Sequence, residues 1–484
     1  MLKRSLLILA PFALLNTAAL AQSDANISLT ELSQALGAEG LSSLQFSAAG
    51  YDYAFGQAPN VKGAWPKINV KSYQRVVTFA PWATSLQRVR TQFEQPPRGG
   101  GGQPIVGEQV QTQAVAAGTS NAASLPGELA LLVPQAFVKA AQAAPDAKAQ
   151  PQSSQGRKYT VVTFTSANKA KTVGWINDKH LLERVQTTID NPVLGDVQQE
   201  AEFADYRDFG GVLFPARIVQ KQNGDTVLDL TVNDAKRNVN ANIEASPPAT
   251  ASVALASEKL GNGVYLITGG YAAIAVDFKD HIVVIEGGQN EQRSEAVIAE
   301  AKRLIPGKPI TEVINTHPHF DHSGGLRTYV AEGATIVTHD ANKGFFEKAL
   351  ANARTLSPDR LSQNPRKVKV RYVGQKSVIS DGEHVVELHH LQDFSHHDGT
   401  LIAYLPKEKV LIQADGFNPP ATAITSTPAN VSPYQLGLAN NIERLQLQVD
   451  RIIPIHLPAD GRKVTLSELW TAVGKPAARA ADAR

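Results

Sequence analysis

Residues 316–325 read THPHFDHSGG, which places three histidines and an aspartate within six positions. The segment before them, 312–316, has the β-branched character of a buried strand. The segment after them, 326–330, can begin a helix. The cluster is therefore predicted to lie on a loop at the carboxyl end of a strand, where a rigid scaffold can hold several ligands in fixed directions. We interpret it as half of a metal site.

The spacing within the cluster indicates how it would bind metal. His317 and His319 share the period of two of an extended chain, so both side chains can reach the same cation. Asp321 and His322 follow on the next turn of chain and can face a second cation. Imidazole and carboxylate groups both suit zinc in tetrahedral or five-coordinate geometry.

The distribution of histidines places the rest of the site in the same part of the chain. Of the 12 histidines, ten lie between His317 and His456, and the first 280 residues hold only His180. A third ligand for the first cation is expected in residues 395–400, SHHDGT. We prefer His396 by its distance from the turn glycine. His397 is the rival, and either histidine can instead be a hydrogen-bond donor behind the ligands.

Two further strand ends supply the remaining candidates. The buried strand ending in Asp415 delivers a carboxylate whose two oxygens can bridge two cations, and without metal its burial would be costly. The strand at 451–455 delivers His456. Taken alone, His456 fits a structural histidine better, but as the last member of this ordered set it becomes a ligand.

The first 21 residues predict a secretory signal peptide. Lys3 and Arg4 form a positive start, residues 6–20 are mostly apolar, and residues 19–21 satisfy the small-residue cleavage rule. We therefore expect a periplasmic or secreted protein. An uncleaved anchor helix is the alternative, but the apolar stretch is short and broken. Elsewhere no run of about 18 apolar residues occurs, so no membrane span is expected in the mature chain.

Composition narrows the remaining classes. The chain has no cysteine, which excludes disulfides, a thiolate nucleophile and a lipobox, and leaves any metal to histidine and carboxylate ligands. Removal of the signal lowers Lys plus Arg from 47 to 45 against 45 Asp plus Glu, a net charge of zero. Nothing in this balance indicates a nucleic-acid partner.

The pattern divides the chain into a β-rich N-terminal domain over 22–245, a proline-containing linker over 246–254 and a catalytic domain over 255–484. In the first domain we expect strands at 43–47 and 73–79 and a loop at the glycine run 96–104. A helix follows at 125–143, then a loop at 145–156 and an antiparallel meander from 159 to 232. Beyond the linker, β-hairpins precede alternating strands and helices, which predicts sheets covered by helices.

The ordered set His317, His319, Asp321, His322, His396, Asp415 and His456 resembles the metallo-β-lactamase superfamily over about residues 255–475. The resemblance implies an α+β fold, with a C-terminal αβ/βα sandwich that carries two metal ions at one edge. It implies that His317, His319 and His396 hold one ion. Asp321, His322 and His456 would hold the other, with Asp415 as the bridge.

Two departures from the family pattern are visible. The early aspartate before glycine is replaced by Glu286, for which we expect an orienting role behind the ligands. The bridging Asp415 is closer to the glyoxalase-II, lactonase and phosphodiesterase branches than to the true β-lactamases. Tyr434 is a candidate donor to an oxyanion, although a packing role is the commoner use of such a residue.

The resemblance implies two divalent metal ions, zinc first with iron or manganese as alternatives. It also implies a hydroxide shared between them that attacks an ester-like bond of a small molecule: a lactone, thioester, amide or phosphoester. Asp321 would orient that hydroxide and take its proton. The alternatives are a β-lactamase-type amide hydrolase, a mononuclear iron dioxygenase acting on persulfides, and a non-catalytic binding protein with a structural metal. The substrate, the oligomeric state and the role of residues 22–245 stay open.

Overall fold

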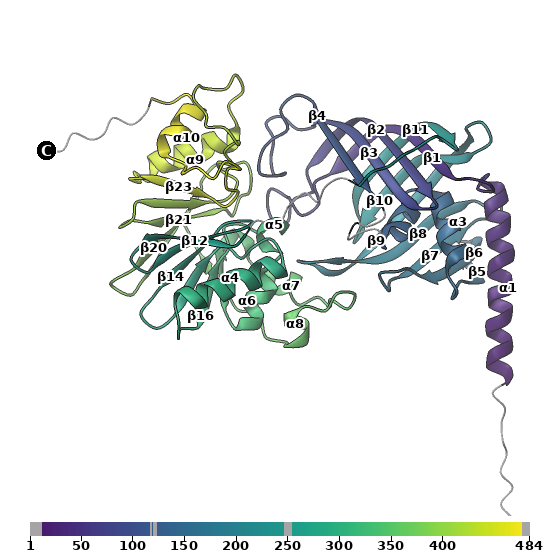
Figure 1. The fold of residues 1–484 in the computed structure, drawn as a ribbon, viewed down its shortest axis with the longest axis horizontal. Coiled ribbons are helices and arrows are strands. Elements are labelled where there is room, and N and C mark those ends of the chain that lie inside the picture. Colours follow the sequence, from purple (N-terminus) through teal and green to yellow (C-terminus); the bar gives the residue numbers. More distant parts are fainter. Residues whose placement is uncertain (1–11, 117–118, 120–122, 246–253, 477–484) are drawn as a thin grey trace, which may run out of the picture.

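The computed structural model describes residues 12–116, 119, 123–245 and 254–476. Two lobes lie side by side: an N-terminal half up to residue 245 and a C-terminal half from residue 254 (Figure 1). Residues 1–11 of the predicted signal peptide and residues 246–253 of the predicted linker lie outside the described residues. None of the described helices is both long enough and apolar enough to cross a membrane.

The described strands of the N-terminal half form one antiparallel sheet of eleven, in the order β4-β3-β2-β1-β11-β10-β9-β8-β7-β6-β5. Their bounds are β1 Ser43–Tyr53, β2 Lys67–Phe79, β3 Trp82–Gln92, β4 Gln109–Val115, β5 Lys148–Ser154, β6 Arg157–Thr165, β7 Lys171–Ile176, β8 Leu182–Asn191, β9 Gly195–Asp208, β10 Leu213–Gln222 and β11 Asp225–Arg237. Strands β6 to β11 neighbour one another in chain order, which confirms the predicted meander.

Three helices, α1 Phe12–Ala35, α2 Leu125–Ala130 and α3 Pro134–Ala143, share one buried core with this sheet. Leu29, Leu32 and Leu36 have helical spacing, and they are buried in the core that also holds Phe46 of β1 and Phe214 of β10. The sheet can therefore bury one face even though it is built without β-α-β crossovers.

Two predictions for the N-terminal half were wrong. The single helix expected over 125–143 is two helices, because Pro134 has no N–H to continue the first and instead occupies the first turn of α3. The loop expected over 145–156 contains the edge strand β5, which pairs with β6. Pro151 is tolerated there because an edge strand leaves backbone groups unpaired on one side.

The C-terminal half contains two facing sheets, ordered β12-β13-β14-β15-β16-β17-β18 and β19-β20-β21-β22-β23. The strand bounds are β12 Ala256–Gly261, β13 Val264–Thr268, β14 Ala273–Asp277, β15 Ile282–Ile285, β16 Ile310–Ile314, β17 Thr335–His339, β18 Val370–Val373, β19 Lys376–Ser380, β20 Val385–His390, β21 Leu401–Leu405, β22 Val410–Gln413 and β23 Arg451–Pro454. The helices are α4 Glu291–Leu304, α5 Phe320–Ser323, α6 Leu326–Glu332, η1 Asp340–Asn342, α7 Phe345–Ala349, α8 Arg360–Gln363, α9 Pro433–Arg444 and α10 Leu466–Ala472.

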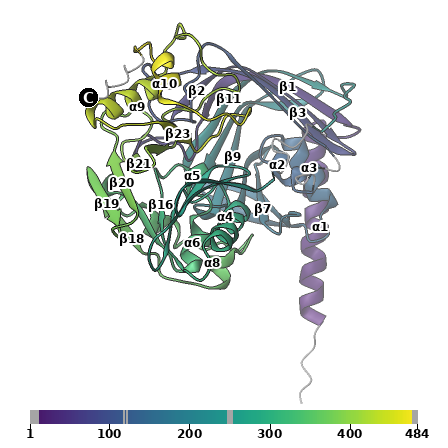
Figure 2. The same cartoon turned by 60° about the vertical axis from the view of Figure 1, so that its left-hand side comes forward.

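Side-chain alternation explains the layers. In β15, Val283 and Ile285 enter the core between the two sheets, while Ile282 and Val284 enter a second core with α4 and α6. The outer face of the other sheet is covered in the same way by α9 and α10 (Figure 2). Strands buried on both faces are continuously apolar, as β15 is. The result is an αβ/βα sandwich after a β-rich N-terminal half, which confirms the predicted fold class.

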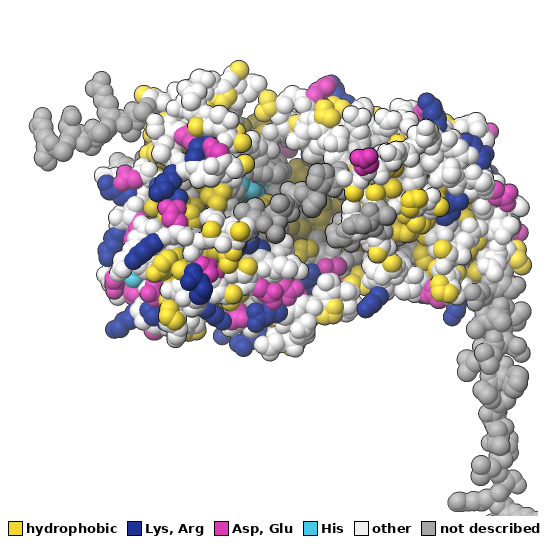
Figure 3. Space-filling model, viewed as in Figure 1, with side chains coloured by type: hydrophobic (Ala, Val, Ile, Leu, Met, Phe, Trp, Pro, Cys, Tyr) yellow, Lys and Arg dark blue, Asp and Glu magenta, His cyan; other side chains and the backbone are white. Residues whose placement is uncertain are grey.

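The two halves are joined by ion pairs and hydrogen bonds as well as by apolar contact. Arg354 donates two hydrogen bonds to Asp190 of β8, at 2.6 and 2.8 Å. Asp196 of β9 accepts hydrogen bonds from the backbone and hydroxyl of Thr355. The surface is hollowed where the two lobes meet (Figure 3). Contacts of this kind fix how the N-terminal loops approach the edge of the sandwich.

Candidate metal centre

Loops at one edge of the sandwich bring the seven predicted ligands together. Each loop follows or joins strands of the two sheets, and parallel pairs such as β15–β16 and β22–β23 place their carboxyl ends at the same edge. The seven side chains are, in chain order, His317, His319, Asp321, His322, His396, Asp415 and His456.

The backbone is unusual at two acidic positions. Glu286 follows β15 with φ +75°, and Asp415 follows β22 with φ +60°. Residues other than glycine seldom adopt positive φ, and such positions concentrate at functional sites. In both cases the left-handed turn directs a buried carboxylate into the cluster instead of continuing the strand.

The first ligand group contains His317, His319, His396 and Asp415, all buried, with their ligand atoms within 4.8 Å of one another. The Nε2 atoms of His317 and His396 are 3.2 Å apart. Oδ2 of Asp415 lies 3.4 Å from the former and 3.2 Å from the latter.

The second group contains Asp321, His322, Asp415 and His456. Nε2 of His322 is 3.0 Å from Oδ2 of Asp415 and 3.3 Å from Nε2 of His456. Nε2 of His456 is 3.0 Å from Oδ1 of Asp415 and 3.7 Å from Oδ2 of Asp321. Asp415 thus belongs to both groups, and its two oxygens face different histidines.

These distances fit cation ligands. Ligand atoms placed tetrahedrally at about 2.0–2.1 Å from a zinc ion are about 3.3 Å from one another. The observed spacings between histidine nitrogens agree with that value. In addition, Nδ1 of the buried His319 has no hydrogen-bond partner among the described residues. A cation would satisfy this nitrogen.

Hydrogen bonds fix which nitrogen of two histidines can bind metal. His319 donates from Nε2 to the backbone oxygen of Ala58 at 2.8 Å, which leaves Nδ1 as the ligand atom. His322 donates from Nδ1 to Oε2 of Glu286 at 2.9 Å, which leaves Nε2. Partners of this kind orient the ring and make the other nitrogen a better ligand. Glu286 therefore lies where its predicted orienting role requires.

At His317, His319 and Asp415 the electrostatics favour the protonation states that bind cations. Burial, together with neighbouring histidines, holds the pKa of His317 well below its usual range and lowers that of His319 to about 3. Burial raises the pKa of the Asp415 carboxyl, but His322 and hydrogen bonds from surrounding histidines outweigh it, and the pKa lies well below its usual range. Neutral imidazole beside ionised carboxylate is the form that binds a cation.

Of the two adjacent histidines, the structure brings His396 into the first group, while His397 stays outside both. Nδ1 of His397 accepts a hydrogen bond from the Gly399 backbone at 2.9 Å. Tyr434 is buried with its ring 4.9 Å from that of His396, and its hydroxyl donates to the backbone oxygen of Gly99 at 2.5 Å. The hydroxyl of Tyr434 is thus engaged with the N-terminal half, and its ring packs beside His396.

Sequence reasoning missed the residues that the N-terminal half and the loop between β13 and β14 contribute to the site. Gln57 donates from Nε2 to Oδ1 of Asp321 at 2.8 Å. Tyr271 donates to Oδ2 of the same carboxylate at 3.1 Å, and its ring lies 4.3 Å from that of His456. Gln57 is 264 residues from its partner and belongs to no motif, so no local signal could have identified it.

The glycine run predicted as a loop is a loop, and it docks against the metal centre. The backbone of Gly99 donates to Ser395 at 3.0 Å and that of Gly100 to Gln57 at 2.8 Å. A β-carbon added at Gly102 would lie 2.4 Å from Oδ1 of Asp415. The loop can approach the Asp415 carboxylate this closely only because glycine has no side chain.

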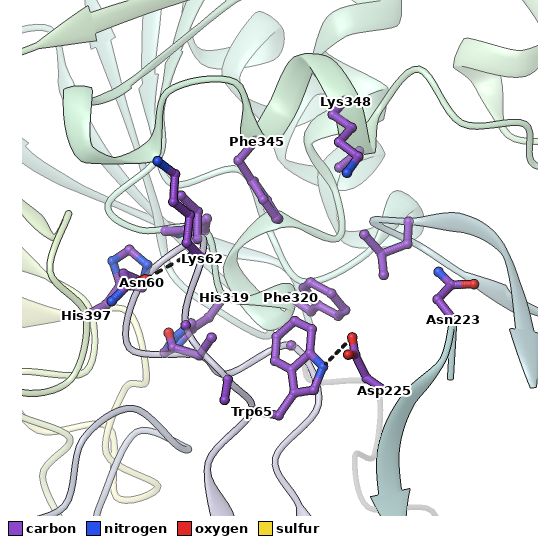
Figure 4. Close-up of a pocket in the computed structure, with 18 of the residues that line it drawn as sticks. Asn60, Lys62, Trp65, Asn223, Asp225, His319, Phe320, Phe345, Lys348 and His397 are labelled. Carbon is purple, nitrogen blue, oxygen red and sulfur yellow. Dashed lines mark hydrogen bonds between the residues drawn. The ribbon is translucent and has the colours of Figure 1, made fainter. Parts of the chain in front are cut away.

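A cleft of about 870 Å³ opens between the two halves beside the centre. His319 and His397 lie at its inner end, and Trp65, Phe320 and Phe345 line its walls (Figure 4). Its volume is in the range of small-molecule sites.

The C-terminal half therefore combines two helix-covered sheets with a histidine and aspartate cluster at one edge. This combination of fold and site indicates the class of protein to which this half belongs. Residues 268–456 match the family model described as the metallo-beta-lactamase superfamily, and this part of the chain is a metallo-β-lactamase superfamily domain.

Solved structures similar to the chain include metallo-β-lactamases from Pontibacter korlensis and Hirschia baltica, at 17% and 18% identity. Each match covers 46% of this chain. The Pontibacter korlensis structure is covered to 98% with a TM-score of 0.34, and the Hirschia baltica structure to 99% with a TM-score of 0.33. FIM-1 from Pseudomonas aeruginosa, in a mono-zinc form, matches at 14% identity over 46% of this chain and 95% of its own, with a TM-score of 0.34. A comparison with curated proteins found no match.

Proposed function

We propose that this protein is an exported hydrolase that binds two divalent metal ions, zinc by preference, and cleaves an ester-like bond of a small molecule. The observation that carries the proposal is the position of Asp415, which belongs to both ligand groups and faces a different histidine with each oxygen. A single structural metal would need only one of these groups.

The difference in exposure between the two groups supports catalysis over a structural role. The first group is buried, whereas the side chains of Asp321 and His456 in the second are 25% and 24% exposed. Structural metal sites are closed by protein ligands, and catalytic sites keep a position open to water or substrate. Substrate would therefore approach from the side of Asp321 and His456.

Cations held by these side chains would polarise the scissile carbonyl or phosphoryl group and lower the pKa of water toward about 7. Asp321 would orient the attacking water and take its proton. Its two oxygens are held separately, Oδ1 by Gln57 and Oδ2 by Tyr271. Burial, with the nearby charge of Asp321, raises the pKa of Tyr271, so its hydroxyl stays protonated and keeps donating.

The export proposal rests on the first 21 residues of the sequence. Cleavage after Ala21 would shorten α1 but keep its packed turns, because Ala25, Leu29, Leu32 and Leu36 are all buried. Mass spectrometry of the protein recovered from a periplasmic fraction should give a chain that begins at Gln22. An intact Met1 terminus in the membrane fraction would contradict export by cleavage.

The test of the reaction uses the full-length mature protein, stripped with a chelator and reloaded with zinc. A panel of a lactone, a thioester, a phosphodiester and nitrocefin should show turnover of an ester-like substrate that depends on the added metal. Preferential turnover of nitrocefin would favour a β-lactamase-type enzyme. One bound iron with oxygen consumption on a persulfide would favour a dioxygenase. Metal binding without turnover of any substrate would favour the alternative of a non-catalytic binding protein.

A further inference from the structure

We propose that the N-terminal half is a working part of the metal centre, and that Gln57 is a positioning residue for Asp321. Gln57 lies on the loop between β1 and β2, and its amide donates to Oδ1 of Asp321 at 2.8 Å. The other oxygen, Oδ2, is the one that faces His322 at 3.5 Å and His456 at 3.7 Å. The amide thereby fixes which oxygen is turned toward the second ligand group.

The loop that carries Gln57 is itself held in register with the metal-site motif. The backbone of Phe320 donates to Gly56 at 3.2 Å, and His319 donates to Ala58 at 2.8 Å. A β-carbon at Gly56 would lie 2.4 Å from the Phe320 ring, so glycine allows the loop to pass this close. Residues 56–58 therefore contact three consecutive members of the motif, 319, 320 and 321, from a different sheet.

Loss of a hydrogen bond behind a metal ligand commonly lowers metal affinity about 10–100-fold. Gln57→Ala removes the donor to Asp321. Gln57→Glu keeps the shape of the side chain but places a carboxylate against a carboxylate. Both variants should weaken the second group, which contains Asp321, and spare the first, which does not. This inference rests on the proposed metal centre and is independent of which bond is hydrolysed.

The same loop supplies a matched control. Asn60 donates from Nδ2 to Oδ2 of Asp398 at 3.0 Å, which is also an amide–carboxylate contact between the halves. Asp398 belongs to neither ligand group. Asn60→Ala therefore removes a similar contact from the interface without touching a metal ligand.

The experiment is a zinc titration in competition with a chromogenic chelator, with the cobalt absorption spectrum as the second readout. Gln57→Ala and Gln57→Glu should bind the first equivalent as wild type does and the second about 10–100-fold more weakly. Asn60→Ala should bind both as wild type does. Wild-type affinity for both equivalents in Gln57→Glu, which preserves packing, would overturn the role of Gln57. A wild-type protein that binds no metal would instead overturn the proposed function, and this inference with it.

An independent observation concerns the cleft, from which we infer a binding site for an organic anion with an apolar group. Lys62, Lys343 and Lys348 line it, all exposed, and none has an ion-pair partner among the described residues. The acidic lining residue, Asp225, accepts a hydrogen bond from Trp65 at 3.0 Å. The walls therefore carry a net charge of +2, with three lysines against one aspartate.

Two of the rings on the apolar wall, Trp65 and Phe320, also join the halves. The rings of Trp65 and Phe320 lie 6.1 Å apart, and Phe345 projects between Lys62 and Lys348 in Figure 4. An aromatic carboxylate would place its ring on this wall and its charge among the lysines. A neutral molecule of the same shape would gain only the first of these contacts.

Calorimetric titration with 2-naphthoate and its neutral carboxamide tests the inference on the full-length protein. The carboxylate should bind more tightly than the carboxamide. Its affinity should fall as ionic strength rises from about 0.01 M to about 0.15 M, because the Debye length falls from about 30 Å to about 8 Å. Lys343→Ala combined with Lys348→Ala should lower its affinity about tenfold, if each exposed charge contributes about 0.7 kcal/mol. Lys158→Ala, on β6, should leave it unchanged. Equal binding of the two probes, or binding of neither, would overturn this inference without affecting the metal centre.

Discussion

Glu286 accepts a hydrogen bond from Nδ1 of His322 at 2.9 Å, and its other oxygen accepts one from the backbone of Thr316 at 2.9 Å. One buried carboxylate thereby fixes both the start of the metal-site motif and its last histidine. Asp321, Asp415 and Glu286 outweigh the effect of burial and raise the pKa of His322 well above its usual value. A cation bound at Nε2 would have to displace any proton held there.

Glu286→Gln is predicted to weaken metal binding by the second ligand group. The amide has one acceptor oxygen where the carboxylate has two, so either His322 or the Thr316 backbone loses its acceptor. The expected loss of affinity is about 10–100-fold, measured by chelator competition. Glu312→Gln is the control, because Glu312 pairs with Arg371 away from the centre. Equal losses in the two variants would contradict a specific role for Glu286.

Asp415→Asn is predicted to reduce the metal content to at most one ion per chain and to abolish hydrolysis. Asparagine is chosen because it tolerates the positive φ of +60° at this position, whereas alanine would add backbone strain to the loss of the ligand. The substitution removes the charge and one of the two carboxylate oxygens of Asp415. Elemental analysis of the purified variant, with an unchanged circular dichroism spectrum, checks the prediction. Two ions in the variant would contradict the bridging role.

Gly102→Ala is predicted to disturb the metal centre from the N-terminal half. The new β-carbon would lie 2.1 Å from Nδ2 of Asn418 and 2.4 Å from Oδ1 of Asp415. Overpacking of this kind costs about 1–3 kcal/mol, which the loop can avoid only by moving off the site. Gly101→Ala is the matched control, because a β-carbon there meets no atom within 4 Å among the described residues. In Gly102→Ala both the thermal unfolding temperature and the metal affinity should change. In Gly101→Ala neither should change.

Asp359→Asn is predicted to destabilise the protein by about 3–5 kcal/mol, because it leaves the buried Arg327 without its carboxylate. Asp359 pairs with Arg327 and lies 3.3 Å from Arg354, which also binds Asp190 of the N-terminal half. Urea unfolding at neutral pH measures the loss. Asp450→Asn, at a carboxylate that is 71% exposed, should change stability little.

The same carboxylate sets a pH dependence. Burial raises the pKa of Asp359, but hydrogen bonds from Arg327 and Ser362 outweigh it and lower that pKa below its usual value. A lowered pKa in the folded state stabilises the protein above the unfolded value of about 3.9, and this contribution is lost as pH falls below that value. Wild type should therefore lose stability more steeply than Asp359→Asn between about pH 5 and pH 2. Parallel losses would contradict the assignment.

The sequence predicted the C-terminal fold and the seven clustered residues because their signals are local. His317 to His322 fall within six positions, and Asp415 and His456 each lie two residues after the end of an apolar strand. Strand β5 was missed because it is a polar edge strand whose burial shows no alternation. Gln57 and Gly102 could not be predicted, because their contacts depend on how two sheets dock and leave no pattern in the chain.

Metal content measured together with turnover tests the central claim most directly. The mature protein, reloaded with zinc and freed of excess metal, is predicted to hold two ions per chain, one for each ligand group. It should hydrolyse a lactone, thioester, amide or phosphoester substrate and lose this activity in step with removal of the metal. One iron per chain with oxygen consumption, or two zinc ions with no hydrolysis of any ester-like bond, would contradict it.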